Sequence, residues 1–330
     1  MARKKKISVI TTFYNAETFI QNAIASVMQQ QGSDFTIEYV IVDDKSQDNS
    51  RKIVEQMIAE YDAAYKDDAL MRENACDKKF KLIEPDENLG CGGARKFGIE
   101  HATGDYFMFL DADDYYIRTD FVQRAYDTIT KTNADIVEFG MVFNHPNGQQ
   151  QMSCVQQQMI VENPMQAEIL LFKDNAIKFN VWTKIYTRAI VESYEYSDER
   201  YFEDVRTIPV WVANAKRIVI MPTCEINYRA ASGSIIRDDI VSTRLGTITA
   251  IAELFERFKD NRDVLKAMYG RAMVDLEALL HNHSSNNKGF NEMSQLNTKM
   301  LKYIFPNTYK DLTYNVEDDP EASPHRPEYD

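Results

Sequence analysis

The stretch Phe107-Met108-Phe109-Leu110-Asp111-Ala112-Asp113-Asp114 decides how this sequence folds. Its four consecutive apolar residues predict a strand that is buried on both faces, as in a parallel sheet. The strand runs directly into three carboxylates, which a hydrophobic core does not need. Carboxylate oxygens suit a hard divalent cation that bridges to phosphates, and ligands of open α/β sheets bind at the carboxyl ends of the strands. The stretch therefore predicts a strand end that holds a metal ion and a nucleotide diphosphate.

Two earlier strands end in the same manner. Residues 7–11 and 37–42 are β-branched, apolar runs, and each is followed by polar residues, at 12–15 and at Asp43-Asp44. Helical patterns follow both runs, and this alternation predicts a parallel sheet with right-handed crossovers. A single acidic pair at a strand end could be a helix cap. Acidic or polar turns at three strand ends of one sheet predict a binding site.

The segment 88–93, Asn-Leu-Gly-Cys-Gly-Gly, is the most glycine-dense part of the chain. It leads into a short predicted helix that carries Ala94 and Arg95. Backbone amides at a glycine-rich helix start can hold an anion. A tight turn that uses the backbone freedom of glycine is an equal alternative from these residues alone.

The second half of the chain mixes short strands and helices before it becomes helical. We expect two short strands, 217–221 and 224–228, around Pro222, and an exposed hairpin or loop in the glutamine-rich stretch that ends at Gln158. From 243 to 302 the pattern is helical, with one break at 281–287. The expected organisation is a catalytic domain over 1–232, with halves of about 1–115 and 116–232, a helical subdomain over 233–305, and an acidic, proline-containing tail over 306–330.

Composition limits the classes of function. The 44% hydrophobic content suffices for a sizeable core, and the formal net charge of -13 argues against a general nucleic-acid binder. The scattered Cys76, Cys91, Cys154 and Cys224 suggest neither a zinc site nor a disulfide framework, which fits a reducing cytoplasm. No apolar run is long enough to span a bilayer. We expect a cytoplasmic protein, or one peripheral at the inner face of the membrane, where the basic residues 3–6 would touch anionic lipid unless they are merely solvated.

Four motifs in order resemble family 2 glycosyltransferases with the GT-A fold. They are Ser-Val-Ile-Thr-Thr-Phe-Tyr-Asn at 8–15, Val-Asp-Asp-Lys-Ser-Gln-Asp at 42–48, Asn88-x-Gly90 with Ala94-Arg95, and Leu-Asp-Ala-Asp-Asp at 110–114. The resemblance covers the first two thirds of the chain. It implies a Rossmann-like, mostly parallel α/β sheet with helices on both faces, to which the C-terminal helices are appended. The sequence departs from the family at Thr12, where members carry Pro, and at Lys96, where they carry Asn.

The resemblance also implies a donor site at the strand ends. Asp43 would accept the uracil N3–H, and Asp113 would be the principal ligand of Mn²⁺ or Mg²⁺, with Asp111 beside it. A metal stabilises a leaving nucleoside diphosphate as a Lewis acid, without proton transfer. The residues implied to contact the nucleotide sugar are Thr11, Thr12, Tyr14, Asp43, Asp44, Asn88, Gly90, Arg95, Asp111, Ala112, Arg229 and Ser234.

The acceptor half would supply the general base. Glu203-Asp204 resembles the Glu-Asp pair of the family, and we choose Asp204 as the base and Glu203 as its orienting neighbour. Without the resemblance, an ordinary acidic first turn favoured by the helix dipole explains these residues as well. Trp182 and Lys184 resemble the Trp-x-Lys of the family and are candidates for acceptor contacts. For Trp182, burial in the core is nearly as good an explanation as stacking on a sugar.

Other classes explain less of the sequence. An EF-hand loop fails because its sixth and twelfth positions would be Tyr116 and Val122 instead of Gly and Glu. A haloacid-dehalogenase-like phosphatase would use Asp111 as nucleophile, but it leaves Asp43-Asp44 without a role. A nucleotidyltransferase would normally show an N-terminal glycine-rich, basic loop, which we do not find. A catalytically silent binder of nucleotide sugars or glycans predicts a broken base, yet Glu203-Asp204 is present.

The favoured hypothesis is an inverting, metal-dependent hexosyl- or N-acetylhexosaminyl-transferase. Its donor would be a nucleotide sugar, most simply UDP-linked, and its acceptor a hydroxyl of a glycan or lipid-linked molecule in cell-surface polysaccharide or glycoconjugate synthesis. The C-terminal helices would hold the acceptor, a second copy of the chain or a membrane surface.

Overall fold

The computed structural model describes residues 3–67, 76–145, 148–229, 240–282 and 299. The strands are β1 (Lys5–Phe13), β2 (Phe35–Asp43), β3 (Lys78–Ile83), β4 (Tyr106–Phe109), β5 (Tyr115–Tyr116), β6 (Ile136–Asn144), β7 (Gln150–Ser153), β8 (Met159–Val161), β9 (Lys184–Thr187) and β10 (Ile218–Arg229). The helices are α1 (Ile20–Met28), α2 (Ser50–Asp67), α4 (Gly90–Glu100), α5 (Phe121–Thr132), α6 (Pro164–Phe172), the short 3-10 helix η1 (Val181–Thr183), α7 (Arg188–Val191), α8 (Glu203–Asn214), α10 (Ile240–Leu254) and α11 (Arg262–Asn282).

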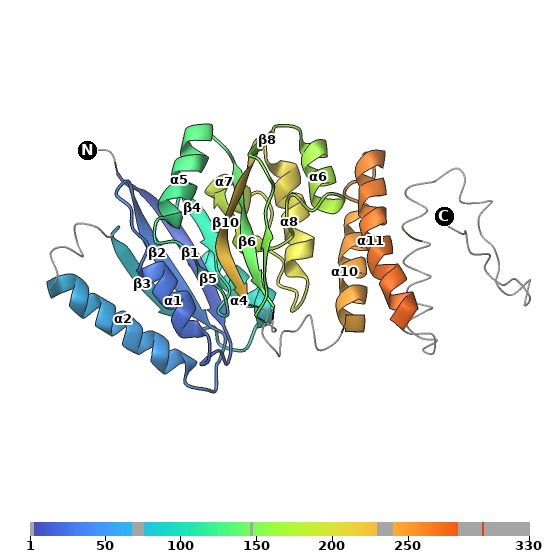
Figure 1. Ribbon diagram of the computed structural model, residues 1–330. Coiled ribbons are helices and arrows are strands. Elements are labelled where there is room, and N and C mark those ends of the chain that lie inside the picture. The colour runs from blue at the N-terminus through green and yellow to red at the C-terminus, as the bar shows by residue number, and fades with distance from the viewer. Residues whose placement is uncertain (1–2, 68–75, 146–147, 230–239, 283–298, 300–330) are drawn as a thin grey trace, which may run out of the picture.

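Within the described residues the strands form one sheet in the order β3-β2-β1-β4-β9-β6-β10-β5, with β7 beside β6 and β8 beside β10. Helices flank both faces of this sheet (Figure 1). The strands β1, β2, β3 and β4 are mutually parallel, whereas β9 runs antiparallel to both β4 and β6. The architecture is thus a mixed α/β fold of the predicted type.

The parallel half confirms the strand predictions from the sequence. Phe107, Met108 and Phe109 of β4 are each 1% exposed, as expected of a strand covered on both faces. In the register, Phe13 of β1 lies beside Asp43 of β2, and Ile10 of β1 lies beside Phe109 of β4. The three polar strand ends therefore meet at one edge of the sheet.

The other half differs from the prediction in one strand. The two short strands expected around Pro222 are a single strand, β10, which pairs with β6 along its length. Proline has no N–H to donate, and the pairing register shifts between Ile220 and Cys224 and again between Cys224 and Ile226. A bulge therefore absorbs the proline without ending the strand. The glutamine-rich stretch contributes β7, which forms a hairpin with β6.

The C-terminal helices pack on two helices of the preceding part of the chain. Helices α10 and α11 lie side by side and contact α8 and α6 (Figure 1). Ile248, Ile251 and Phe255 at this contact are at most 1% exposed. The helical pattern breaks at residues 255–261, earlier than predicted, whereas the predicted break at 281–287 and the tail at 306–330 lie almost wholly outside the described residues. Among the described helices, none is both long and apolar enough to cross a bilayer.

Two glycines test how α10 is docked. A methyl group at Gly246 of α10 would overlap the ring of Phe202, the residue before α8, whereas one at Gly270 of α11 would meet nothing within 4 Å. We expect Gly246→Ala to lower the free energy of unfolding by about 1–3 kcal/mol, as overpacking does. Gly270→Ala, the matched control in an exposed helix position, should raise it by roughly 0.5–1 kcal/mol. Urea unfolding measures both, and equal stability of the two variants would contradict this docking.

Candidate active site

Three carboxylates gather at the carboxyl end of β4. The candidate ligand oxygens of Asp111, Asp113 and Asp114 all lie within 4.8 Å of one another. Burial and the neighbouring charge of Asp111 raise the pKa of Asp113 to about 6. Burial, followed by the charges of Asp113 and Asp111, raises the pKa of Asp114 well above its usual range. The protein thus holds like charges together at a cost that a bound cation would remove.

The chemistry of this acidic triad fits a hard divalent cation. One oxygen of Asp114 accepts the backbone N–H of Arg229 at 2.9 Å, while the other is buried and has no hydrogen-bond partner among the described residues. An unsatisfied buried carboxylate oxygen beside two other carboxylates is the donor set that Mg²⁺ or Mn²⁺ requires. Asp111, Asp113 and Asp114 are therefore the residues that would hold the ion. The sequence analysis did not assign Asp114, although its place in the same acidic run was a signal.

Arg95 joins the acidic triad to the start of α8. It lies in α4, is 6% exposed, and donates from one guanidinium nitrogen to Asp111 at 2.6 Å and from the other to Glu203. Burial alone would lower the pKa of Arg95, but Asp111 and the neighbouring groups hold it well above the usual value. The sequence analysis expects Arg95 to contact the nucleotide. The structure instead places its charge between the two acidic parts of the site.

Glu203 and Asp204 form the first turn of α8. Glu203 is 5% exposed, and Asp204 is half-buried and accepts the backbone N–H of Val205 at 2.8 Å. Burial and the adjacent charge of Glu203 raise the pKa of Asp204 to about 7, an effect that Arg95 opposes. A carboxylate with a pKa near neutrality is a far better proton acceptor than an ordinary aspartate. The site thus combines a candidate base with a candidate metal centre.

The glycine-rich turn at residues 88–93 holds a carboxylate of the protein itself, that of Asp44. The carboxylate of Asp44 accepts the backbone N–H groups of Leu89 at 2.7 Å and of Gly90 at 2.9 Å. Asn88 donates its side-chain amide to the backbone carbonyl of Asp44 at 2.7 Å. Gly90 has a φ of +73°, which favours glycine. Both alternatives from the sequence are thus partly correct: the turn needs glycine, and its amides are satisfied by Asp44.

The residues expected around the nucleoside base lie at the edge of the sheet formed by β1 and β2. Asp43 is 1% exposed and accepts the backbone N–H of Ser46 at 2.9 Å, with Arg51 at 3.3 Å. The side chain of Thr11 is fully buried, and its hydroxyl shares a hydrogen bond with the Tyr39 hydroxyl at 3.0 Å. Thr12 is half-buried and Tyr14 is 47% exposed at the same strand end. Ala112 lies half-buried within the acidic triad.

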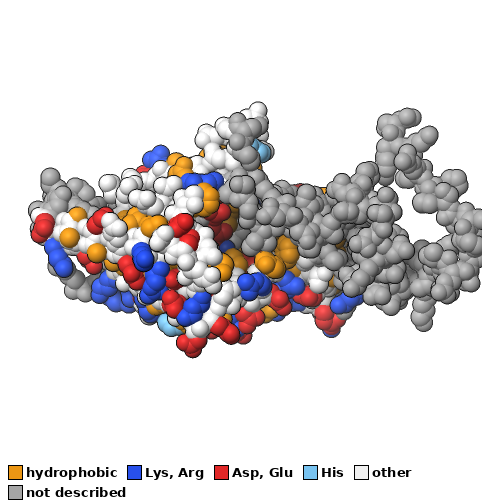
Figure 2. Space-filling model, turned by 90° about the horizontal axis from the view of Figure 1, so that it is seen from below, with side chains coloured by type: hydrophobic (Ala, Val, Ile, Leu, Met, Phe, Trp, Pro, Cys, Tyr) orange, Lys and Arg blue, Asp and Glu red, His pale blue; other side chains and the backbone are white. Residues whose placement is uncertain are grey.

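The end of the molecule at which these strands stop is shown in Figure 2. Acidic and basic side chains are interspersed over its visible surface (Figure 2). Arg229 lies at the end of β10, and its guanidinium is 5.0 Å from the ring centroid of Phe19. Its backbone N–H donates a hydrogen bond to the carboxylate of Asp114. Ser234, the other residue expected to close over the diphosphate, lies outside the described residues.

The predicted acceptor residues are buried. Trp182 is 4% exposed and stacks on Tyr228 with ring centroids 5.4 Å apart, as the core interpretation requires. The ammonium of Lys184 forms an ion pair with Glu138 at 2.9 Å and donates to the backbone carbonyls of Lys178 and Asn180, both at 2.7 Å. Neither side chain reaches a surface in this conformation. The structure thus gives both a role in holding η1 and β9 in place.

Removing Lys184 should destabilise the fold severely. Both partners of the ion pair are at most 1% exposed, so Lys184→Met leaves a buried, unpaired carboxylate on Glu138. We expect a loss of about 3–5 kcal/mol in the free energy of unfolding, most of which Glu138→Leu should restore in the double variant. The exposed pair of Lys131 and Asp127 is the control, since Lys131→Met should cost less than about 1 kcal/mol. Urea unfolding that shows the two single variants to be equally mild would contradict this.

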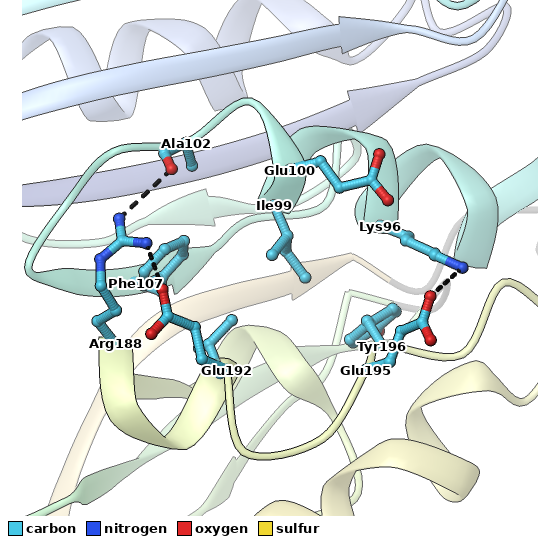
Figure 3. Close-up of a pocket in the computed structure, with 10 residues that line it drawn as sticks. Lys96, Ile99, Glu100, Ala102, Phe107, Arg188, Glu192, Glu195 and Tyr196 are labelled. Carbon is cyan, nitrogen blue, oxygen red and sulfur yellow. Dashed lines mark hydrogen bonds and ion pairs between the residues drawn. The ribbon is translucent and has the colours of Figure 1, made fainter.

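A cavity of about 350 Å³ lies between α4 and α7. Four of its five charged residues are paired with one another, Lys96 with Glu195 at 2.6 Å and Arg188 with Glu192 at 2.9 Å (Figure 3). Phe107 of β4 forms part of its wall, whereas none of the residues of the acidic triad lines it. We therefore place the active site at the triad and not in this cavity.

The fold and the acidic strand end together define a GT-A-like α/β protein. The sequence profile described as glycosyl transferase family 2 matches residues 8–188, more than half of the chain. The chain therefore belongs to glycosyl transferase family 2, as the motifs predict. The family consists of glycosyltransferases, so the phosphatase alternative with Asp111 as nucleophile is wrong.

Curated relatives agree with this assignment, and solved structures share the fold. The chain is 25% identical over 242 residues to glycosyltransferase GlyG of Streptococcus pneumoniae serotype 4, covering 71% of this chain and 73% of that protein. It is 38% identical over 109 residues to the teichoic acid poly(glycerol phosphate) polymerase of Staphylococcus epidermidis, covering 33% of this chain and only 13% of that protein. Residues 1–349 of S. aureus TarS, solved in complex with UDP-GlcNAc, superpose with a TM-score of 0.63 at 18% identity, covering 91% of this chain and 81% of TarS.

A second solved structure carries a metal. The mannosyltransferase PcManGT from Pyrobaculum calidifontis, in complex with GDP-Man and Mn²⁺, matches with a TM-score of 0.51 at 15% identity. The match covers 94% of this chain and 88% of that one. At these identities the two structures establish the fold alone.

Proposed function

We propose that the chain is an inverting, metal-dependent glycosyltransferase that moves a hexosyl or N-acetylhexosaminyl group from a UDP-linked donor to a hydroxyl of a glycan or lipid-linked acceptor. The observation that carries this proposal is the chain of contacts from the acidic triad through Arg95 to Glu203, next to Asp204. It joins a centre for a cation to a candidate base with a pKa of about 7. Single displacement needs both groups around one reacting carbon.

The residues of the site divide the reaction between them. Asp111, Asp113 and Asp114 would hold Mn²⁺ or Mg²⁺, which when bound would neutralise the charge that develops on the leaving diphosphate. Asp204 takes the proton of the acceptor hydroxyl as its oxygen attacks the anomeric carbon. The bond to the diphosphate oxygen breaks on the opposite face, so the configuration at that carbon inverts. Glu203, fixed by Arg95, keeps Asp204 from turning away.

Known proteins support the choice of donor and of pathway class. TarS binds UDP-GlcNAc and PcManGT binds GDP-Man with Mn²⁺, which favours a nucleotide sugar and a cation here. The teichoic acid polymerase among the relatives favours a role in making a cell-surface polymer. The cysteines Cys76, Cys91, Cys154 and Cys224 are free thiols, which agrees with the cytoplasmic location expected from the sequence.

The domain boundaries are part of the same proposal. Residues 1–232 would form the catalytic unit, and α10 and α11 would present the acceptor, a second copy of the chain or a membrane surface. Helix α10 packs on α8, which carries Glu203 and Asp204, and α11 packs on α6. The packing agrees with an acceptor-side role.

A panel of nucleotide sugars tests the proposal. The purified chain is incubated with UDP-, GDP- and TDP-linked hexoses and N-acetylhexosamines, with Mn²⁺ or with a chelator, and release of the nucleoside diphosphate is measured. We expect cation-dependent release from at least one UDP-sugar. Failure to bind or consume every donor, with and without Mn²⁺, would reject the proposed function.

A further inference from the structure

The buried residue Tyr196 has a hydroxyl group that the fold does not use. It lies between α7 and α8 and is 3% exposed. Its ring packs against Phe109 at the end of β4 and against Trp211 of α8, with centroids 6.2 and 5.6 Å away. These contacts fix the ring, yet the hydroxyl has no hydrogen-bond partner among the described residues. Buried polar groups are nearly always paired, so this group requires an explanation.

The ring of Tyr196 packs between the end of β4, which leads into Asp111, and helix α8, which begins with Glu203 and Asp204. After burial, which is the largest cause, the charges of Glu203 and Asp204 raise the pKa of Tyr196 well above its usual range, and Arg95 opposes them. A hydroxyl with so high a pKa keeps its proton at every working pH. It is therefore a permanent hydrogen-bond donor on which the charges of two carboxylates act. The cavity of Figure 3 is lined by the same residue, but the hydroxyl responds to the charges of the active site.

We propose that Tyr196 is a positioning residue that donates its hydroxyl hydrogen bond to Asp204 when substrates are bound and so aims this carboxylate at the acceptor hydroxyl. This inference rests on the proposed role of Asp204 as the base. Glu203 is the poorer acceptor because the guanidinium of Arg95 already donates to it. From the described part of the chain, the side chain of Asp204 accepts one hydrogen bond, from the backbone N–H of Val205. The arrangement resembles other general bases, which need a second group to orient them.

Several other groups act on the charge of Asp204, and none offers an equivalent donor. Tyr186 of β9 already donates its hydroxyl to the backbone carbonyl of Val181 at 3.0 Å. Lys184 is held by Glu138. Besides Tyr196, the titratable and charged groups that interact with the charge of Asp204 are Cys91, Arg95, Asp111, Lys184, Tyr186 and Glu203.

The test is the pH profile of Tyr196→Phe, which keeps the ring and removes the hydroxyl. The readout is kcat between pH 5 and 9 for nucleoside diphosphate release from the nucleotide sugar that the wild type consumes fastest. A hydrogen bond to the ionised carboxylate lowers its pKa, so its loss should move the acidic limb up by about one pH unit. The maximal kcat should fall several-fold, and KM for the donor should stay unchanged.

The matched control is Tyr61→Phe. Tyr61 is 8% exposed, and its hydroxyl also has no partner among the described residues, but it packs on Tyr65 and Phe80. The acidic residues that act on it are Asp62 and Asp77, which are not part of the active site. This variant should keep the wild-type profile. An unmoved acidic limb in Tyr196→Phe, even with a lower kcat, would overturn the proposal because it indicates a structural role only.

The outcome is separable from that of the proposed function. If Asp204→Asn is inactive and the acidic limb of the pH profile does not move in Tyr196→Phe, only the role of Tyr196 is overturned. Asp204→Asn with wild-type turnover would remove the base itself, and with it this inference. A wild type that consumes no nucleotide sugar would overturn both.

Discussion

Asp204→Asn should reduce kcat for sugar transfer by about 10²–10⁴-fold and leave UDP binding intact, because it removes the proton acceptor and keeps the shape of the side chain. The pKa of about 7 gives the wild type a further signature. Only the ionised carboxylate accepts a proton, so wild-type kcat should fall as the pH drops below about 7. The residual activity of the variant should lack this limb. Near-normal turnover would show that another group is the base.

Stability distinguishes loss of the base from loss of the fold. A carboxyl whose pKa rises on folding destabilises the native state as the pH rises from its unfolded value of 3.8 through about 7. Asp204→Asn lacks this cost, so the variant should be more stable than the wild type above pH 7, and the difference should vanish below about pH 4.

Asp198→Asn is the matched control for activity. This acid precedes α8, is 68% exposed and pairs with Lys96, so its loss should leave kcat unchanged.

Asp113→Ala should have the second largest effect, about 10²–10³-fold in kcat/KM for the donor. The physical reason is the loss of one carboxylate from a set whose oxygens lie within 4.8 Å of one another and whose joint function would be to hold a cation worth several kcal/mol in the transition state. The affinity for UDP in the presence of Mn²⁺ should fall, whereas the affinity in the presence of a chelator should not change. Calorimetric titration measures both affinities.

An exposed acid of the same region provides the comparison. Asp120 pairs with Arg118 at 2.8 Å before α5, and its side chain is 45% exposed. Asp120→Ala should bind UDP and Mn²⁺ as the wild type does. A Mn²⁺-dependent titration that is the same in Asp113→Ala and in the wild type would contradict the metal assignment.

The sequence predicted the sheet edge because that edge depends on local patterns. Apolar runs that end in Asp43-Asp44 and in Asp111 to Asp114 identify strands and their direction, and parallel pairing then brings the ends together. The family resemblance, carried by the same stretches, is confirmed by the match over residues 8–188. The roles of the individual site residues remain predictions that the variants above test.

The partners of the charged side chains could not be predicted. Arg95 reaches Glu203 across 108 positions, and Asp44 reaches the turn at Gly90 across 46, so no short motif contains either pair. The burial of polar residues inside the core could not be predicted from the sequence either. Thr11 looks like a ligand-binding residue in its motif, but Tyr39 on the next strand satisfies its hydroxyl. Lys184 is buried because Glu138 and two backbone carbonyls satisfy its charge and its donors.

Breaks in regular structure were the other source of error. Pro222 suggested the end of a strand, since proline removes a ladder hydrogen bond, but a bulge keeps β10 continuous. The turn at residues 255–261 between α10 and α11 contains no proline or glycine, but it ends in Asn261. The side-chain oxygen of Asn261 accepts the backbone N–H of Val264 at 3.2 Å and so caps the start of α11, a signal that was missed in the sequence.

The central claim is that Asp111, Asp113 and Asp114 gather around one divalent cation together with a nucleoside diphosphate. The most direct measurement is electron paramagnetic resonance of free Mn²⁺ during titration of the full chain with Mn²⁺ and UDP, corrected for Mn²⁺ bound by UDP alone. We expect about one Mn²⁺ to disappear from the free signal per chain in the wild type, and none in Asp113→Ala. A free Mn²⁺ signal that is the same with wild-type protein as with UDP alone would contradict the claim.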